Sequence, residues 1–193
     1  MSCSHRILTR SPQQTQDVGR ALGEKARPGD VILLDGPLGA GKTCLTQGIA
    51  MGLGITGYVR SPTFVLMARY SGRLTLHHLD LYRVGSSQEA WDLGLDEQIS
   101  GDGLCVVEWP DRAPDLFVRN GPSGPDAAPD GSQSGALWVK LAYSQTENSD
   151  TGDSDTGDLR EIELSGGPKH YCGALAELAA KYPADNQLEK GGV

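Results

Sequence analysis

The chain has 193 residues, of which 38% are hydrophobic and 22% are charged, and its formal net charge at pH 7 is −8. This length and apolar content predict one globular domain with a single core over residues 1–193. The acidic balance argues against a protein that binds nucleic acid directly, because such binding depends on clustered Lys and Arg.

The first part of the chain alternates helical and strand-like segments. Ser11 followed by Pro12 and Gln14 is typical of a helix start, with a capping serine, a first-turn proline and a glutamine three residues after the cap. The apolar run at residues 31–34 predicts a buried strand, and a helix from Lys42 to about Gly52 would place Leu45, Ile49 and Leu53 on one face. This order of strand, loop and helix indicates an α/β unit.

The middle of the chain adds further strands. Residues 64–68 and 74–79 are strand candidates on either side of a Ser-Gly turn, and residues 104–107 form another continuous apolar run. A short helix is expected at residues 88–93. These elements predict a central, mostly parallel sheet flanked by helices.

The composition changes to Gly, Pro, Ser and Asp between about residues 119 and 158. Residues 149–153 are repeated without change at 154–158, so we interpret 119–158 as a flexible, acidic, low-complexity insertion. A calcium site is the alternative, since aspartates alternate with small polar residues, but no glutamate stands at the spacing of an EF-hand.

The last third of the chain predicts an antiparallel hairpin and a helix. Within the insertion, residues 137–141 have the character of a strand, and the alternation at 160–164 predicts its hairpin partner. Residues 171–182 predict a C-terminal helix.

Cellular location is indicated by the apolar pattern and the cysteines. The sequence shows no apolar run long enough to cross a bilayer, which predicts a cytoplasmic protein with no membrane association. Cys3, Cys44, Cys105 and Cys172 lack C-x-x-C spacing, which predicts reduced thiols. Cys44 stands in the first turn of a helix, where the dipole can lower a thiol pKa and make it peroxide-sensitive; a helical residue with no role is the alternative.

Residues 36–43, Gly-Pro-Leu-Gly-Ala-Gly-Lys-Thr, match the phosphate-binding loop pattern between a predicted strand and a predicted helix. Glycines let successive backbone N–H groups turn inward around the phosphates, and the helix N-terminus adds its positive dipole end. Lys42 adds a cation and Thr43 a magnesium ligand. We expect ATP with Mg²⁺ to bind at Gly36, Leu38, Gly39, Ala40, Gly41, Lys42, Thr43 and Cys44; a Gly-rich turn without a ligand is the alternative. The fold predicted is therefore an α/β, P-loop NTPase-like one.

Two carboxylates follow later apolar strands. Asp80 stands where a hard oxygen can reach Mg²⁺ held by Thr43, although it could instead cap the next turn. Glu108 ends a buried strand and should face the same crevice, because ligands of open α/β sheets bind beyond the carboxyl ends of the strands. Glu108 is either a magnesium ligand or the base that orients water. Lys42, Asp80 and Glu108 are the predicted catalytic residues, and Thr43, Asp80 and Glu108 the predicted metal ligands.

Four other residues have functional and structural interpretations. Thr63 lies in a switch-like segment that could sense the γ-phosphate, or it simply begins a strand. Trp109 packs beside the nucleotide, anchors a partner, or belongs to the core. His77 and His78 are adjacent in a strand, so they face opposite sides, and we interpret both as structural.

Four motifs follow the loop in order: Ser61-Pro62-Thr63-Phe64, His78-Leu79-Asp80-Leu81-Tyr82-Arg83, the segment 89–96 with its Leu-Gly-Leu, and Val107-Glu108-Trp109-Pro110. With these motifs, from about Ser11 to Asp111, the chain resembles the TsaE family of small bacterial P-loop ATPases, also called YjeE. The insertion after Asp111 departs from the compact form of that family.

The resemblance implies a cytosolic ATPase that acts with TsaD-type and TsaB-type proteins when threonylcarbamoyl is installed on the adenosine next to the anticodon. Hydrolysis would support turnover of that complex, and tRNA would be met only through it. The resemblance also implies that Arg160 lies near the nucleotide base.

Other functions stay open at this point. A small-molecule or nucleotide kinase commonly needs a cationic lid, and residues 120–158 contain one lysine, Lys140, and no arginine. A GTPase is disfavoured because Asn-Lys-x-Asp and Asp-x-x-Gly do not occur in the sequence. A nucleotide-sensing adaptor without significant hydrolysis is the third alternative, and Glu108 argues weakly against it.

Overall fold

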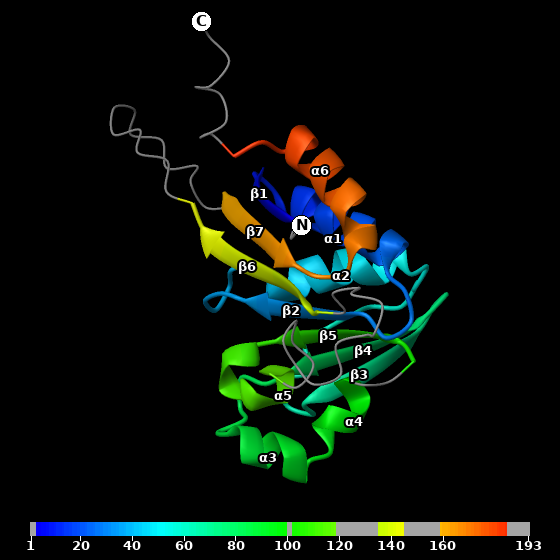
Figure 1. The fold of residues 1–193 in the computed structure, drawn as a ribbon, viewed down its shortest axis with the longest axis vertical. Helices are drawn as coiled ribbons and strands as arrows, with labels where there is room; N and C mark the ends of the chain where they lie inside the picture. Colours follow the sequence, from blue (N-terminus) through cyan, green and yellow to red (C-terminus); the bar gives the residue numbers. More distant parts are fainter. Residues whose placement is uncertain (1–2, 100–101, 119–134, 145–158, 185–193) are drawn as a thin grey trace, which may run out of the picture.

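The computed structural model describes residues 3–99, 102–118, 135–144 and 159–184. Within these residues, seven strands form one sheet in the order β1-β7-β6-β2-β5-β4-β3, with helices on both faces (Figure 1). The strands are β1 (Ser4–Thr9), β2 (Val31–Asp35), β3 (Met67–Ser71), β4 (Thr75–Asp80), β5 (Leu104–Glu108), β6 (Leu137–Tyr143) and β7 (Arg160–Gly166). The helices are α1 (Pro12–Lys25), α2 (Lys42–Gly52), α3 (Ser87–Asp92), α4 (Leu95–Ile99), α5 (Asp115–Val118) and α6 (Cys172–Lys181).

The centre of the sheet is parallel and its edges are antiparallel. β2 pairs in parallel with β5 and with β6, and β4 pairs in parallel with β5. The pairs β1–β7, β6–β7 and β3–β4 are antiparallel. The prediction of a mostly parallel α/β sheet with an antiparallel C-terminal hairpin is confirmed.

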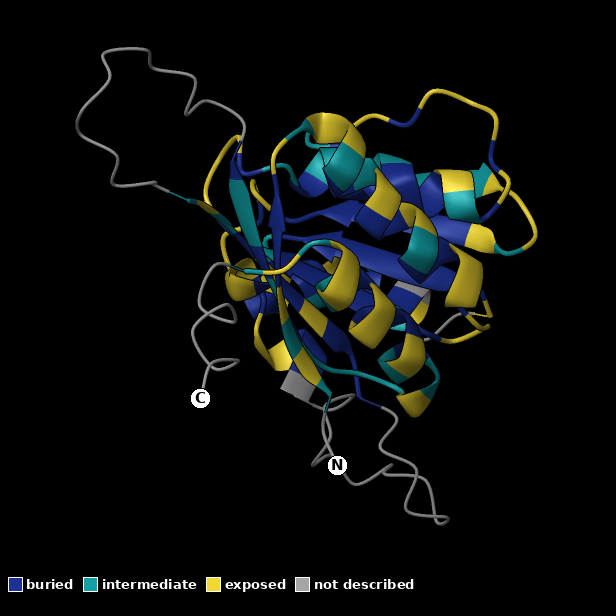
Figure 2. Ribbon diagram, turned by 90° about the horizontal axis from the view of Figure 1, so that it is seen from above, coloured by how far each residue is buried: buried dark blue, intermediate teal, exposed yellow. Residues whose placement is uncertain are grey.

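Two apolar clusters fill the space on the two faces of the sheet. α1, α2 and α6 cover one face, and α3, α4 and α5 cover the other (Figure 1). β2 serves both, since Ile32 and Leu34 face the first cluster and Leu33 faces the second. A strand buried on both faces reads as a continuous apolar run, which is why it was recognisable in the sequence. Figure 2 shows the buried sheet with the exposed helix surfaces outside it.

α1 and α2 pack with their backbones almost touching. A Cβ atom added to Gly19 of α1 would lie 2.2 Å from the Leu45 carbonyl oxygen, and one added to Gly48 of α2 would lie 2.2 Å from the Gln16 carbonyl oxygen. Such distances are far below van der Waals contact, so only glycine fits where the helices meet. This packing fixes α2 against the rest of the fold.

Four elements differ from the sequence prediction. β1, α4 and α5 were not predicted. The strand expected at 64–68 begins only at Met67, because the preceding residues form a turn in which Leu66 has φ 63°. A positive φ ends an extended segment. Phe64 and Val65 are consequently exposed, at 88% and 72%, rather than paired in the sheet.

The state of the cysteines also differs from the sequence prediction. Cys3, just before β1, forms a disulfide with Cys172 at the start of α6, with a Cα–Cα distance of 5.7 Å. The prediction of four reduced thiols is therefore wrong for this pair, while Cys44 and Cys105 are free. The two residues stand 169 positions apart in the sequence, and only the packing of β1 beside α6 brings them together.

The predicted insertion at 119–158 lies outside the described residues except for 135–144, which include β6. The repeated segment and its calcium alternative lie outside them too. Among the described residues, no helix has the length and apolar character needed to cross a membrane.

Candidate active site

The phosphate-binding loop connects the end of β2 to the start of α2. Gly36, Gly39 and Gly41 have φ values of 143°, 78° and 105°, which side chains rarely tolerate. A Cβ on Gly36 would also lie 2.2 Å from the Leu141 carbonyl oxygen. The N-cap residue of α2 is Gly41, which has no side chain to cap the first turn. Its N–H groups are therefore available to an anion in the loop.

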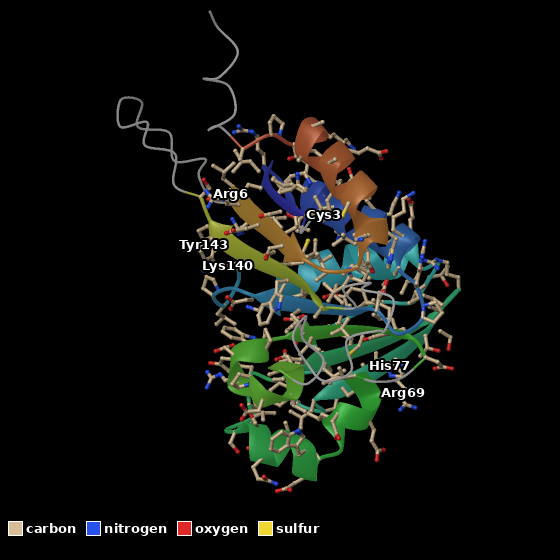
Figure 3. All side chains as sticks on the ribbon, in the orientation of Figure 1. Cys3, Arg6, Arg69, His77, Lys140 and Tyr143 are labelled. Carbon is tan, nitrogen blue, oxygen red and sulfur yellow. A yellow bond between two sulfur atoms is a disulfide. The ribbon has the colours of Figure 1, made fainter. Side chains whose placement is uncertain are left out.

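The last residue of β6 holds the tip of this loop. The Tyr143 hydroxyl donates a hydrogen bond to the Leu38 carbonyl oxygen at 2.8 Å, and Tyr143 lies at the carboxyl end of β6, the strand next to β2 (Figure 3). The Arg160 guanidinium lies 4.6 Å from the Tyr143 ring centre. Arg160 is thus brought beside the loop through Tyr143, a residue that the sequence prediction missed. Its role toward a nucleotide base stays a prediction.

The amine of Lys42 is held inside the loop. Its Nζ donates to the Gly36 carbonyl at 2.6 Å and to the Pro37 carbonyl at 3.0 Å, and it lies 3.7 Å from the centre of the Trp109 ring. Burial lowers the pKa of the amine, and the nearby carboxylates of Glu108 and Asp80 act in the opposite direction. Lys42 and both predicted carboxylates therefore share one electrostatic environment.

Trp109 covers this amine from the end of β5. Its backbone is left-handed, with φ 61°, and its N–H donates to the Leu34 carbonyl at 3.2 Å. The ring packs against Tyr82 with 5.0 Å between ring centres. A turn directly after β5 points the indole at the loop. The indole thus lies beside the phosphate-binding loop and also packs against the second apolar cluster, while its contact with a nucleotide stays a prediction.

Glu108 joins the loop to the neighbouring strand. The Thr43 hydroxyl donates to its Oε1 at 3.0 Å and approaches Oε2 at 3.3 Å, and His78 Nε2 lies 2.9 Å from the same Oε1. Glu108 is 3% exposed. Asp80 and Glu108 are register partners of β4 and β5, so both carboxylates end at one edge of the sheet. The predicted convergence of Lys42, Thr43, Asp80 and Glu108 is present in the structure.

Asp80 binds the segment that precedes β3. Its Oδ2 accepts hydrogen bonds from the hydroxyls of Ser61 and Thr63, the latter at 2.5 Å, and its Oδ1 accepts from the Tyr82 N–H at 3.0 Å. Thr63 therefore faces the predicted metal ligand and does not begin a strand. The hydrogen bond from the Tyr82 N–H also supports the alternative in which Asp80 caps the turn after β4.

The structure favours the alternative interpretation of Cys44, a helical residue without an activated thiol. Burial raises the pKa of this thiol, and the opposing effect of Arg160 is smaller. Its Sγ donates to the Pro12 carbonyl of α1 at 3.4 Å. Burial at the α1–α2 contact thus acts against an activated thiol at this position.

The residues at this edge fit a magnesium ion. One hydroxyl and two carboxylates are hard oxygen donors of the kind that Mg²⁺ prefers, with waters and substrate phosphates completing its coordination. Within the described ranges, no group of three or more His, Cys, Asp or Glu could hold a metal without such help. A metal shared between Thr43, these carboxylates and a bound phosphate agrees with both observations.

Comparisons with known proteins show the fold and the family of the chain. A crystal structure of Bacillus subtilis YdiB superposes on the chain with a TM-score of 0.66 and 30% sequence identity, covering 94% of this chain and 97% of that chain. The family model described as "Threonylcarbamoyl adenosine biosynthesis protein TsaE" matches residues 9–124. The chain belongs to the TsaE family.

Individual TsaE relatives match about half of the chain. The protein named tRNA threonylcarbamoyladenosine biosynthesis protein TsaE from Treponema pallidum is 47% identical over 107 residues, which is 55% of this chain and 79% of the relative. The Bacillus subtilis protein of that name is 49% identical over 102 residues, 52% of this chain and 63% of the relative. The family resemblance drawn from the motifs is confirmed.

Proposed function

We propose that this TsaE-family chain is a Mg²⁺-dependent ATPase of tRNA threonylcarbamoyladenosine biosynthesis, working with TsaD-type and TsaB-type proteins and meeting tRNA only through them. The observation that supports it most is the contact between Thr43 and Glu108 at the mouth of a loop that encloses Lys42. The names of the relatives support the pathway.

Each residue of the loop edge has a proposed role. Lys42 neutralises phosphate charge, since its amine already lies among backbone groups of the loop. The Thr43 hydroxyl and the Glu108 carboxylate would hold the magnesium ion. When bound, that ion neutralises charge on the phosphates of ATP. Asp80 holds the segment of Ser61 and Thr63 next to the same place.

The contact with Thr43 favours one of the two roles considered for Glu108. A P-loop threonine hydroxyl is the usual protein ligand of the nucleotide's magnesium. Because Glu108 lies within hydrogen-bond distance of that hydroxyl, we assign it to the metal. A base that orients water would instead be expected beyond the γ-phosphate.

Slow hydrolysis by the isolated chain is part of the proposal. In the described structure the Lys42 amine donates hydrogen bonds to two loop carbonyls and is covered by Trp109. These hydrogen bonds must break before the amine can bind a phosphate. We expect TsaD-type and TsaB-type proteins to raise the rate. The same observation supports the adaptor alternative, in which ATP binding alone controls docking.

ATP turnover measured with and without the partner proteins, in Mg²⁺ and in EDTA, tests the proposal. We expect Mg²⁺-dependent turnover that rises with the partners and is lost in Lys42→Ala. Lys140→Ala, at an exposed lysine of β6, is the matched control and should leave turnover unchanged. Binding without turnover in every condition would favour the adaptor, and phosphate transfer to an added metabolite would favour a kinase.

A further inference from the structure

His78 occupies a position in β4 where the surrounding strands are apolar. Its side chain is fully buried, and its strand neighbours on the same face are Leu76 and, across the pair, Val106, both without solvent exposure. Within the described part of the chain, His78 Nδ1 has no hydrogen-bond partner. An unsatisfied buried polar atom costs about 1–3 kcal/mol. Packing alone therefore does not explain a histidine here.

The other ring nitrogen has one partner, and that partner is Glu108. Nε2 lies 2.9 Å from Glu108 Oε1, the oxygen that also accepts from the Thr43 hydroxyl. An ionised carboxylate only accepts hydrogen bonds, so Nε2–H is the donor. One carboxylate oxygen is thus fixed from two sides, by the strand behind it and by the loop in front of it.

We propose that His78 is a positioning residue that orients the Glu108 carboxylate toward Thr43 and the magnesium site. The inference deepens the proposed function and rests on it. In the described part of the chain, the hydrogen-bond partner of His78 is Glu108 on the neighbouring strand rather than a residue of the loop. The hydrogen bond from His78 limits rotation of the Glu108 side chain. Of the several rotamers open to a glutamate, it favours the one in which the carboxylate reaches Thr43. Groups behind metal ligands act in this way in other metal sites.

The chain offers a matched control in His77. It is also buried, at 7% exposure, and as the next residue along the strand it lies on the opposite face of β4. Among the described residues, neither of its ring nitrogens has a hydrogen-bond partner. His77→Leu and His78→Leu make the same chemical change one residue apart. Only His78→Leu removes a donor to Glu108. His78→Gln is the conservative variant, because its amide nitrogen can take the place of Nε2.

The experiment measures ATP affinity with and without Mg²⁺, the Mg²⁺ concentration for half-maximal turnover, and kcat and KM separately. We expect His78→Leu to weaken the Mg²⁺ response about 10- to 100-fold, the usual effect of removing a group behind a metal ligand. Mg²⁺-free ATP affinity should stay within about twofold of the wild type. His78→Gln should recover most of the loss, and His77→Leu should show none of it.

Several outcomes would overturn the proposal. An unchanged Mg²⁺ response in folded His78→Leu would do so, and so would a His78→Gln variant as impaired as His78→Leu. If His78→Leu does not fold, His78→Asn takes its place, since its shorter amide cannot reach Glu108; equal Mg²⁺ responses in the Asn and Gln variants would then contradict the proposal.

The binding measurement separates this inference from the proposed function. If the wild type binds Mg·ATP more tightly than ATP but never hydrolyses it, the ATPase proposal fails and the positioning role is still tested. If Mg²⁺ has no effect on ATP affinity in the wild type, the metal site is absent and the role of His78 is overturned with it.

Discussion

Replacing Gly48 with alanine should separate the two helices that carry and support the phosphate-binding loop. The added Cβ would lie 2.2 Å from the Gln16 carbonyl oxygen and 2.8 Å from the carbonyl carbon and Cα of the same residue. All three are backbone atoms of α1, so no side-chain rotation relieves the contact. α1 and α2 must move apart by about 1 Å to reach the closest distances that real Cβ atoms show.

The expected loss follows from two opposing contributions. Alanine is favoured over glycine in a helix interior by about 1 kcal/mol. Overpacking a tight contact costs typically about 1–3 kcal/mol, and occasionally more; the upper part of that range applies because backbone atoms are involved. The net decrease in the free energy of unfolding should be about 2 kcal/mol. At this chain length that corresponds to a melting temperature lower by about 4–8 °C.

Urea unfolding and thermal melting followed by circular dichroism measure this difference. Gly173→Ala in α6 is the matched control, because a Cβ there would have no neighbouring atom within 4 Å. We expect that variant to be more stable by up to about 1 kcal/mol. A Gly48→Ala protein as stable as the wild type, or a parallel loss in both variants, would refute the close-packing argument.

Other predictions concern the disulfide and two buried groups. The Cys3–Cys172 bond spans 169 residues, and loop closure puts its contribution to stability at up to about 5 kcal/mol; dithiothreitol should therefore lower the melting temperature, and no change would contradict the bond's role. Burial raises the pKa of the Cys105 thiol to about 12, so iodoacetamide should modify it only after unfolding, as mass spectrometry can check. Burial and the Asp30 carboxylate raise the pKa of the Tyr171 phenol above its ordinary 10.0, so the folded protein holds this proton more tightly than the unfolded chain. The contribution of the protonated phenol to the free energy of unfolding is therefore complete below about pH 10 and declines by about 1.4 kcal/mol per pH unit above it. Tyr171→Phe should flatten that decline in alkaline urea titrations; an equal slope in both proteins would be evidence against it.

The centre of the fold could be predicted because local chemistry specifies it. The glycines at 36, 39 and 41 permit only a loop of this kind between a buried strand and a helix, and β2 and α2 begin and end within one residue of the expected positions. The convergence of Asp80 and Glu108 also follows from local signals, since carboxyl ends of parallel strands meet at one edge of a sheet.

The missed features depend on contacts between distant segments. β1 has a mixed polar sequence and is a strand because β7 offers it an open edge. The pairing of Cys3 with Cys172 needs the same placement. The contact of Tyr143 with the loop depends on which strand lies beside β2, which periodicity does not reveal.

His78 illustrates a residue whose signal was present but ambiguous. Its position two residues before Asp80 places both on one face of β4. The sequence showed that much, but it did not show that Glu108 occupies the same face of the adjacent strand. The register of β4 against β5 places Glu108 on the face of His78, and this register cannot be read from a single sequence.

The indole of Trp109 rests 3.7 Å from the Lys42 ammonium group, whereas the chain's other two tryptophans, Trp91 and Trp138, belong to α3 and β6. Emission from an indole responds to a charge placed on its face. A ligand that draws the ammonium group away from the indole would change the fluorescence emission of Trp109 and not that of the other two tryptophans. Intrinsic tryptophan fluorescence would then report binding at the phosphate-binding loop without an added label.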